Sequence, residues 1–181
     1  MEITHCHEAR FYSNESMVLD DLTQLIGAAL KAGNAAIVVA TESHRDNLLP
    51  RLQAYGLDIA AGIEQGRYLA LDAADVVSRF MVNDLPDPAR FLELAGRLIM
   101  AAAKSVSREY PRVALCGECD PPLWTLGKGQ AAIRLEQLWN VIAMRYHVDI
   151  LCEYPLSSFH GEQGHHIFQR ICAQHSAVYS R

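Results

Sequence analysis

The chain has 181 residues, 50% of them hydrophobic, and its 16 lysines and arginines against 21 aspartates and glutamates give a formal net charge of −5. This length corresponds to about one domain, which buries roughly 70% of the surface of the unfolded chain. We therefore expect a single domain over residues 1–181. Direct binding of nucleic acid is not expected, because the sequence has no cluster of basic residues to face the phosphates.

The cysteines and the first residues indicate a cytoplasmic protein. The five cysteines are an odd number and have no framework spacing, so disulfides are not expected. Residues 1–10 lack the apolar core of a signal peptide. The longest apolar stretches are far shorter than the roughly 18 residues that suggest a membrane-spanning helix. We expect a reducing cytosol and no membrane association.

Helix and strand patterns alternate in the first half of the chain. A helix capped by Ser16 stops near Gly33, and the apolar strand Ala35 to Ala40 follows. Ser43 is the predicted cap of a second helix, which ends at Gly56. A short strand over residues 67–71 and a short helix over residues 73–81 complete this half.

The second half repeats the alternation with longer helices. The turn at residues 84–88 introduces a helix from Ala89 to about Arg108, and residues 113–116 read as a central strand. A helix over residues 130–145, a strand from Val148 to Cys152 ended by Tyr154 and the proline after it, and a last helix over residues 163–174 follow. Strands that alternate with helices of this length predict a three-layer α/β/α fold with a mostly parallel sheet.

Ligands of such sheets bind at the carboxyl ends of the strands. In this sequence those ends carry acids and aromatics, at residues 41–42, 72, 118–120 and 153–154. This strand-end rim is the predicted binding site.

The first sixty residues follow the order of a nucleotide-binding α/β domain but lack its phosphate loop. Such a loop needs glycines whose N–H groups converge on the phosphate, a lysine, and a hydroxyl for magnesium. Only Ser16 could supply one of these groups. The sequence therefore argues against ATP hydrolysis.

Short motifs along almost the whole chain resemble the MEDS domain, the sensory domain named for methanogens, methylotrophs and DcmR-type regulators. They are His7, Phe11-Tyr12, the helix end Ala-Leu-Lys-Ala-Gly, residues 37–41, Gly117-Glu118, Leu123-Trp124, Leu135-Glu136 with Asn140, residues 151–154 and His175-Ser176. The first helix through Glu42 more distantly resembles KaiC/RecA-like ATPases.

The resemblance implies a RecA/KaiC-like fold without a phosphate loop and a non-catalytic sensory module without a cofactor. Its expected ligand is a small organic molecule, such as a hydrocarbon derivative. The expected partner is a histidine kinase or transcription regulator on a separate protein, since this chain shows no output domain. The long apolar helix at residues 89–108 is compatible with a homodimer and equally with a core helix.

The rim and the resemblance together give ten candidate ligand contacts: His7, Phe11, Tyr12, Glu118, Trp124, Glu136, Asn140, Cys152, Tyr154 and His175. Each has a structural alternative. The aromatic rings could be core, Glu118 could be a paired strand-end carboxylate, and Glu136 with Asn140 could be a hydrogen-bonded pair on a helix surface. His175 could simply complement the dipole of the last helix.

Two other functions stay open. A degenerate ATPase could use Glu42 and Glu118 on a nucleotide held without a phosphate loop. An interaction module could fill the equivalent pocket with its own side chains. No nucleophile elbow of the Gly-x-Ser-x-Gly type is present.

No metal site is expected, although three local patterns supply donors. They are Cys116 with Cys119, His5 with His7, and His160 with His165 and His166. A lone Cys-x-x-Cys is a weak signal for zinc, because a site needs all of its ligands to converge.

Overall fold

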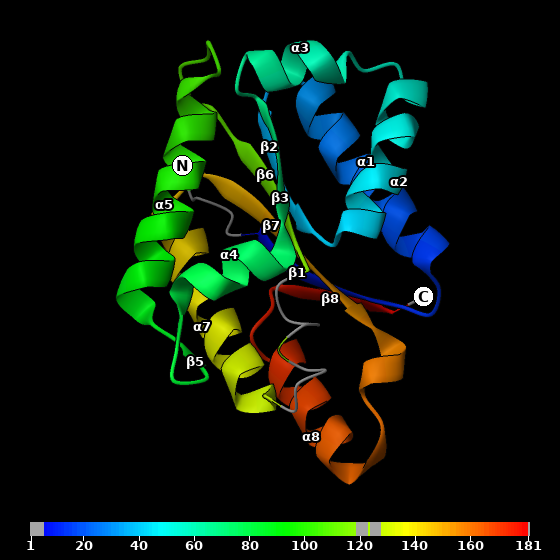
Figure 1. The fold of residues 1–181 in the computed structure, drawn as a ribbon, viewed down its shortest axis with the longest axis vertical. Coiled ribbons are helices and arrows are strands. Elements are labelled where there is room, and N and C mark those ends of the chain that lie inside the picture. The colour runs from blue at the N-terminus through cyan, green and yellow to red at the C-terminus, as the bar shows by residue number, and fades with distance from the viewer. Residues whose placement is uncertain (1–5, 119–122, 124–127, 181) are drawn as a thin grey trace.

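The protein is a three-layer α/β/α structure in the computed structural model, which describes residues 6–118, 123 and 128–180 (Figure 1). Parallel strands form the six-stranded central sheet in the order β3-β2-β6-β7-β1-β8. They are β1 (Cys6–Tyr12), β2 (Ala35–Ala40), β3 (Tyr68–Asp72), β6 (Val113–Gly117), β7 (Val148–Pro155) and β8 (Ala177–Ser180). The predicted fold class is confirmed.

Helices cover both faces of the sheet. On one face lie α1 (Glu15–Lys31), α2 (Glu42–Ala54) and α3 (Ile59–Glu64). On the other lie α4 (Ala73–Phe80), α5 (Pro88–Lys104), α7 (Gly129–Arg145) and α8 (Gly161–Cys172). A small hairpin of β4 (Met81–Val82) and β5 (Leu85–Pro86) joins α4 to α5, and the 3-10 turn η1 (Leu156–Ser158) follows β7.

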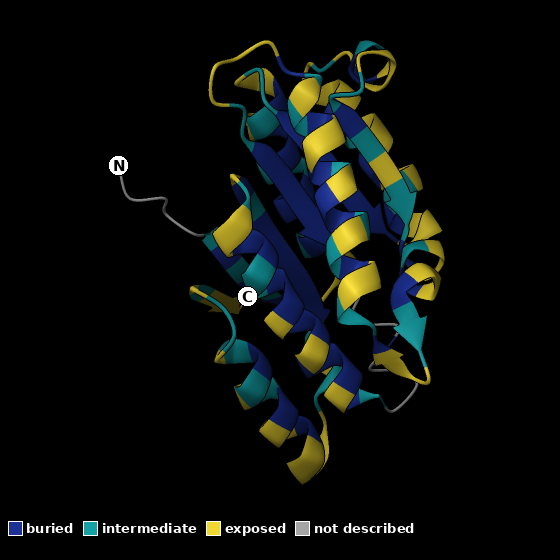
Figure 2. Cartoon of the chain, turned by 90° about the vertical axis from the view of Figure 1, so that its left-hand side faces the viewer, coloured by how far each residue is buried: buried dark blue, intermediate teal, exposed yellow. Residues whose placement is uncertain are grey.

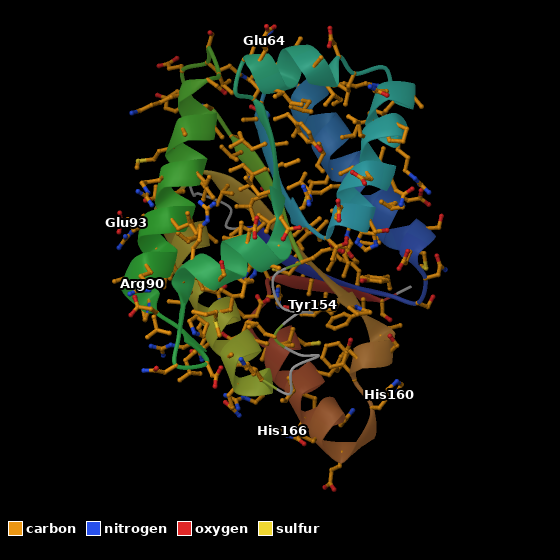
Figure 3. All side chains as sticks on the ribbon, in the orientation of Figure 1. Glu64, Arg90, Glu93, Tyr154, His160 and His166 are labelled. Atoms are coloured by element: carbon orange, nitrogen blue, oxygen red, sulfur yellow. The ribbon has the colours of Figure 1, made fainter. Side chains whose placement is uncertain are left out.

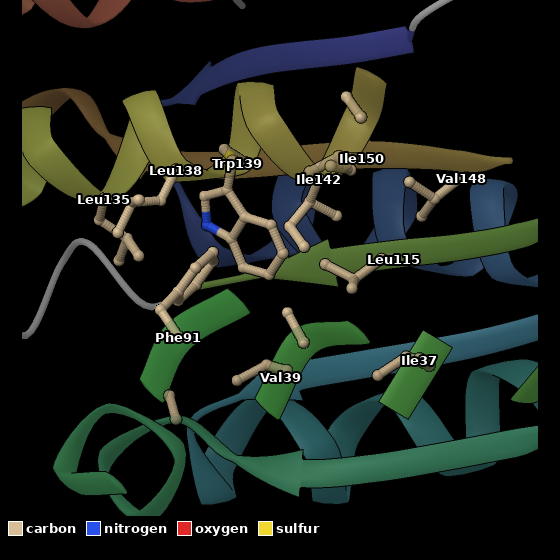
Figure 4. Close-up of a cluster of buried hydrophobic side chains, with 14 of the residues drawn as sticks. Ile37, Val39, Phe91, Leu115, Leu135, Leu138, Trp139, Ile142, Val148 and Ile150 are labelled. Atoms are coloured by element: carbon tan, nitrogen blue, oxygen red, sulfur yellow. The ribbon is translucent and has the colours of Figure 1, made fainter. Parts of the chain in front are cut away.

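The hydrophobic core has two parts, one on each face of the sheet. Successive side chains of a strand point to opposite faces, so Ile37 packs with α5 and α7 while Val38 packs with α1 and α2. Phe91 of α5 meets Trp139 of α7 edge to face at 4.7 Å between ring centroids (Figure 4). Figure 2 shows the buried sheet and the exposed outer sides of the helices. Amphipathic helices therefore bury a sheet that is apolar on both faces.

No helix in the described ranges is both long and apolar enough to cross a bilayer.

The predicted helix caps were wrong by two residues. Asn14 caps α1 by accepting from the Met17 N–H, and Thr41 caps α2 by accepting from the His44 N–H. Ser16 and Ser43 lie inside the first turns. Asn, Thr and Ser can all cap a helix, so the sequence pattern did not decide which residue is the cap, and the strand–helix junction did.

Other element bounds also differ from the prediction. Strand β7 continues beyond Cys152 to Pro155, because its pairing with β1 extends to that residue and a proline is tolerated at a strand end. Helix α5 ends at Lys104 rather than near Arg108. The sequence did not predict β1 or β8, because each shows only a short alternation of polar and apolar residues. In the sheet, β1 pairs with β7 on one side and with β8 on the other.

Candidate functional site

A group of polar side chains is buried between the sheet and the helices α7 and α8. In the parallel register of β1 and β7, Ala9 pairs with Cys152 and Phe11 with Tyr154, so His7, two residues before Ala9, shares their face. Helix α7 contributes residues one turn apart, and the chain after α8 contributes a histidine. We call the resulting set the polar cluster: His7, Glu136, Asn140, Cys152, Tyr154 and His175.

Glu136 lies at the centre of the polar cluster. Its Oε2 is 3.0 Å from Nε2 of His7 and 3.0 Å from Nε2 of His175. Its Oε1 accepts a hydrogen bond from the hydroxyl of Tyr154. The Sγ of Cys152 is 3.8 Å from Oε2 of Glu136 and 3.5 Å from Nε2 of His7. Both histidine rings and the thiol thus face one carboxylate oxygen.

The far nitrogen of each histidine ring is held by a carbonyl oxygen. Nδ1 of His7 is 2.9 Å from Oδ1 of Asn140, and Nδ1 of His175 is 2.8 Å from the main-chain oxygen of Ile171. The amide nitrogen of Asn140 lies 3.4 Å from Oε1 of Gln174, which favours this orientation of the amide. Since a carbonyl oxygen only accepts, Nδ1 carries the proton in both rings.

Burial and charge act in opposite directions on the ionisable groups of the polar cluster. Glu136 is 0% exposed, and this burial opposes its ionisation. The adjacent imidazoles of His175 and His7 outweigh burial and hold the pKa of Glu136 well below its usual value. Burial also lowers the pKa of His175, but the Glu136 carboxylate outweighs it and the net direction is upward. The arrangement therefore favours a charged carboxylate in an apolar interior.

Aromatic rings border the polar cluster on the side of α8. Phe11 stacks on Tyr154 at 5.2 Å between centroids and lies 4.6 Å from Phe168 of α8. Phe159 contacts Phe11, Tyr154 and Phe168 edge to face at 5.6 to 6.0 Å. We call these four residues the aromatic set. Figure 3 shows Tyr154 between the sheet and α8.

Seven of the ten predicted contact residues come together: the six of the polar cluster and Phe11. They lie on one face of the sheet, against α7 and α8, and Phe11 and Tyr154 lie near the carboxyl ends of β1 and β7. Trp124 lies outside the described residues. Whether any of the ten contacts a ligand stays a prediction.

Tyr12 and Glu118 belong to a different place, on the side of α1 and α2. Oε1 of Glu118 is 2.5 Å from Nδ1 of His44, and its Oε2 accepts from the Thr41 N–H at 3.0 Å. Burial, with the charge of Glu118, raises the pKa of Tyr12. Glu42 lies exposed in the first turn of α2. No local pattern identified His44 as the partner of Glu118, because the two are 74 residues apart.

Four donors of the polar cluster have the composition of a metal site. One ligand atom from each of His7, Glu136, Cys152 and His175 lies within 4.8 Å of the others. Among the described residues, these four form the group of His, Cys, Asp or Glu side chains that could hold a metal ion. Of the local patterns named from the sequence, the pair His5 and His7 contributes one donor, His7, while His5 lies outside the described residues. His160, His165 and His166 are exposed, and Figure 3 shows His160 and His166 at α8. Cys116 is buried on the opposite sheet face, and Cys119 lies outside the described ranges.

Four pockets that can be described lie away from the polar cluster. One, of about 480 Å³, lies between α1 and α2 beside Asp20 and Tyr55. Another, of about 400 Å³, lies between α7 and the β5 hairpin beside Gln137 and Arg170. Neither is lined by the predicted contact residues.

The family model described as the methanogen/methylotroph, DcmR sensory domain matches residues 6–170, a range that includes every member of the polar cluster except His175. No curated protein matches the chain. Because the matched range covers most of the chain, this protein belongs to the MEDS family of sensory domains.

Proposed function

We propose that this protein senses a small organic molecule at the junction of the polar cluster and the aromatic set, and passes the signal to a partner protein. Membership of the MEDS family supports the sensory role. The burial of the polar cluster supports the proposed position of the ligand site. Polar groups are costly to bury, and a fold that needed only stability would be served by apolar side chains there.

The composition of this junction suits a small ligand with an apolar body and one polar group. Small-molecule sites are usually lined by aromatic and apolar side chains with a few fixed polar groups. Here Phe11, Phe159 and Phe168 supply the apolar part and Tyr154 joins it to Glu136.

Helix α8 is the element that a ligand at this junction would displace. It packs on the core through Ile167 and Ile171, and Phe168 belongs to the aromatic set. A ligand that bound better to a form with α8 moved outward would shift the population toward that form. A partner that contacts α8 could then detect the ligand.

Thermal unfolding with a panel of short alcohols, amines and halogenated hydrocarbons tests this function. A ligand at a hundred times its Kd adds about 2.7 kcal/mol, which raises the Tm of a chain of this size by about 5–10 °C. Phe168→Ala should abolish the shift, whereas Leu92→Ala, a half-buried apolar residue on α5, should preserve it. An unchanged Tm across the panel, or a shift that survives Phe168→Ala, would contradict the proposed site.

Titration with ATP and Mg²⁺ tests the nucleotide alternative. That alternative needs the carboxylate of Glu118 for magnesium, yet both of its oxygens already have partners in His44 and Thr41. Saturable binding with turnover that is lost in Glu118→Gln would favour an ATPase instead.

A further inference from the structure

The four donor atoms of the polar cluster lie within 4.8 Å of one another, and four of their six separations are close to the edges of a tetrahedral metal site. Zinc bonds of 2.0–2.3 Å place neighbouring ligand atoms about 3.3–3.8 Å apart. The measured separations are 3.0 Å from Glu136 Oε2 to each histidine Nε2, 3.5 Å from Cys152 Sγ to His7 Nε2, and 3.8 Å from Cys152 Sγ to Glu136 Oε2. An ion at the centre requires shifts of only a few tenths of an ångström along these edges.

The protonation of the two histidines also points to a cation. Each ring donates through Nδ1 to a carbonyl oxygen, of Asn140 or of Ile171, which leaves the lone pair of a neutral ring on Nε2. Both Nε2 atoms face the same carboxylate oxygen of Glu136. In the metal-free chain a second ring proton on Nε2 can bind this carboxylate, and a cation among the three atoms takes the place of such protons.

The surrounding contacts resemble the outer shell of known metal sites. Metal-binding histidines usually donate their other ring nitrogen to a carbonyl or carboxylate, and metal-binding carboxylates are themselves hydrogen-bonded. Here Asn140 and Ile171 hold the rings, and Tyr154 occupies Oε1 of Glu136, so that Oε2 is left for the ion.

Charge balance favours a divalent ion. Two neutral imidazoles, one carboxylate and one thiolate carry a total charge of −2, which a dication cancels. The Cys152 thiol releases its proton to solvent when the ion binds. A neutral site avoids the large cost of an unpaired charge in the interior.

We propose that His7, Glu136, Cys152 and His175 bind one divalent transition-metal ion, with zinc the best match. Thiolate and imidazole together favour zinc over magnesium or calcium, which prefer oxygen ligands. This metal site rests on the proposed function, because it uses the same polar cluster. The bound ion would give the polar group of a small ligand an atom to bind.

Titration of the tag-free, chelator-treated full chain with Zn²⁺ and Co²⁺ tests this site. We expect one equivalent of either ion to bind, with Co²⁺ giving the visible bands of tetrahedral coordination and a thiolate charge-transfer band. Cys152→Ser should weaken binding at least tenfold and remove the charge-transfer band. Cys116→Ser is the matched control, because Cys116 and Cys152 are both 1% exposed on central strands but face opposite sides of the sheet.

Two further variants separate this site from other metal binding. His175→Gln should weaken Zn²⁺ binding at least tenfold even if Cys152→Ser fails to fold. A double variant, His165→Ala with His166→Ala, should leave the affinity unchanged, because those rings are exposed on α8. The metal site is overturned if the folded wild-type chain binds neither ion, or if binding survives both Cys152→Ser and His175→Gln.

The organic-ligand panel, run on metal-free and Zn²⁺-loaded protein, keeps the two proposals distinguishable. Zinc binding without any response to the panel refutes the proposed function and leaves the metal site standing. A response of the metal-free protein, together with no zinc binding, refutes the metal site alone.

Discussion

The hydroxyl of Tyr154 should contribute measurably to stability, because it donates to a carboxylate in the interior. Tyr154 is 2% exposed and its hydroxyl bonds to Oε1 of Glu136. Tyr154→Phe keeps the ring and its stacking on Phe11, so no large cavity forms. The change leaves a buried charged acceptor without this donor, and hydrogen bonds to charged groups are worth about 1.5–3 kcal/mol.

Urea unfolding of the metal-free chain, followed by circular dichroism, measures this loss. With a slope of about 2 kcal/mol per molar urea, the midpoint should fall by roughly 1 M. A double-mutant cycle with Glu136→Gln should give a coupling energy of at least about 1 kcal/mol, since the two side chains are in contact. Tyr68→Phe, at a buried tyrosine on the other side of the sheet, should cost at most about 1 kcal/mol.

Two results would refute this reasoning. One is a loss below about 0.5 kcal/mol in Tyr154→Phe, which would place the hydroxyl in water or against a neutral group. The other is additivity of Tyr154→Phe and Glu136→Gln, which would show that the two side chains do not interact.

Two further predictions concern the pair of His44 and Glu118 and the hydrophobic core. The hydrogen bond to Glu118 raises the pKa of His44 above its ordinary value of 6.5, so the stability from this pair is fully present below pH 6.5 and is lost as the pH rises through the native pKa. Urea unfolding between pH 5.5 and 8.5 should therefore show a smaller decline in Glu118→Gln than in the wild type; parallel curves would contradict the pairing. Phe91→Ala, at a residue 2% exposed against Trp139, should cost about 3–5 kcal/mol by calorimetry, and Phe91→Leu clearly less; equal losses would show that the site does not depend on packing volume.

Local sequence patterns were enough to predict the layered fold. Strand β2 is six consecutive apolar residues, and all six are buried as expected of a central parallel strand. Helical spacing on α7 placed Glu136 and Asn140 on the same side, and both belong to the polar cluster. Periods of 3.6 and 2 residues are local properties, so the sequence reveals them without any knowledge of the rest of the chain.

The positions of β1 and β8 depended on tertiary pairing. The seven residues of β1 alternate between buried and half-buried positions, and only the register with β7 and β8 turns His7 and Phe11 toward α7 and α8. The family resemblance named the individual residues, but it did not show which would touch. Glu118 lies apart from the other candidates because it follows the carboxyl end of β6 on the side of α2, where His44 binds it.

The amino-acid sequence by itself determined the alternating elements, the apolar sheet and the lack of a phosphate loop. The tertiary structure alone decided that two histidines, a glutamate and a cysteine come together in the interior, from β1, α7, β7 and the chain after α8. Their separation along the chain reaches from residue 7 to residue 175, so no short spacing could reveal them. Metal ligands are recognised by convergence in space, and only the packing of α7 and α8 on adjacent parallel strands produces that convergence.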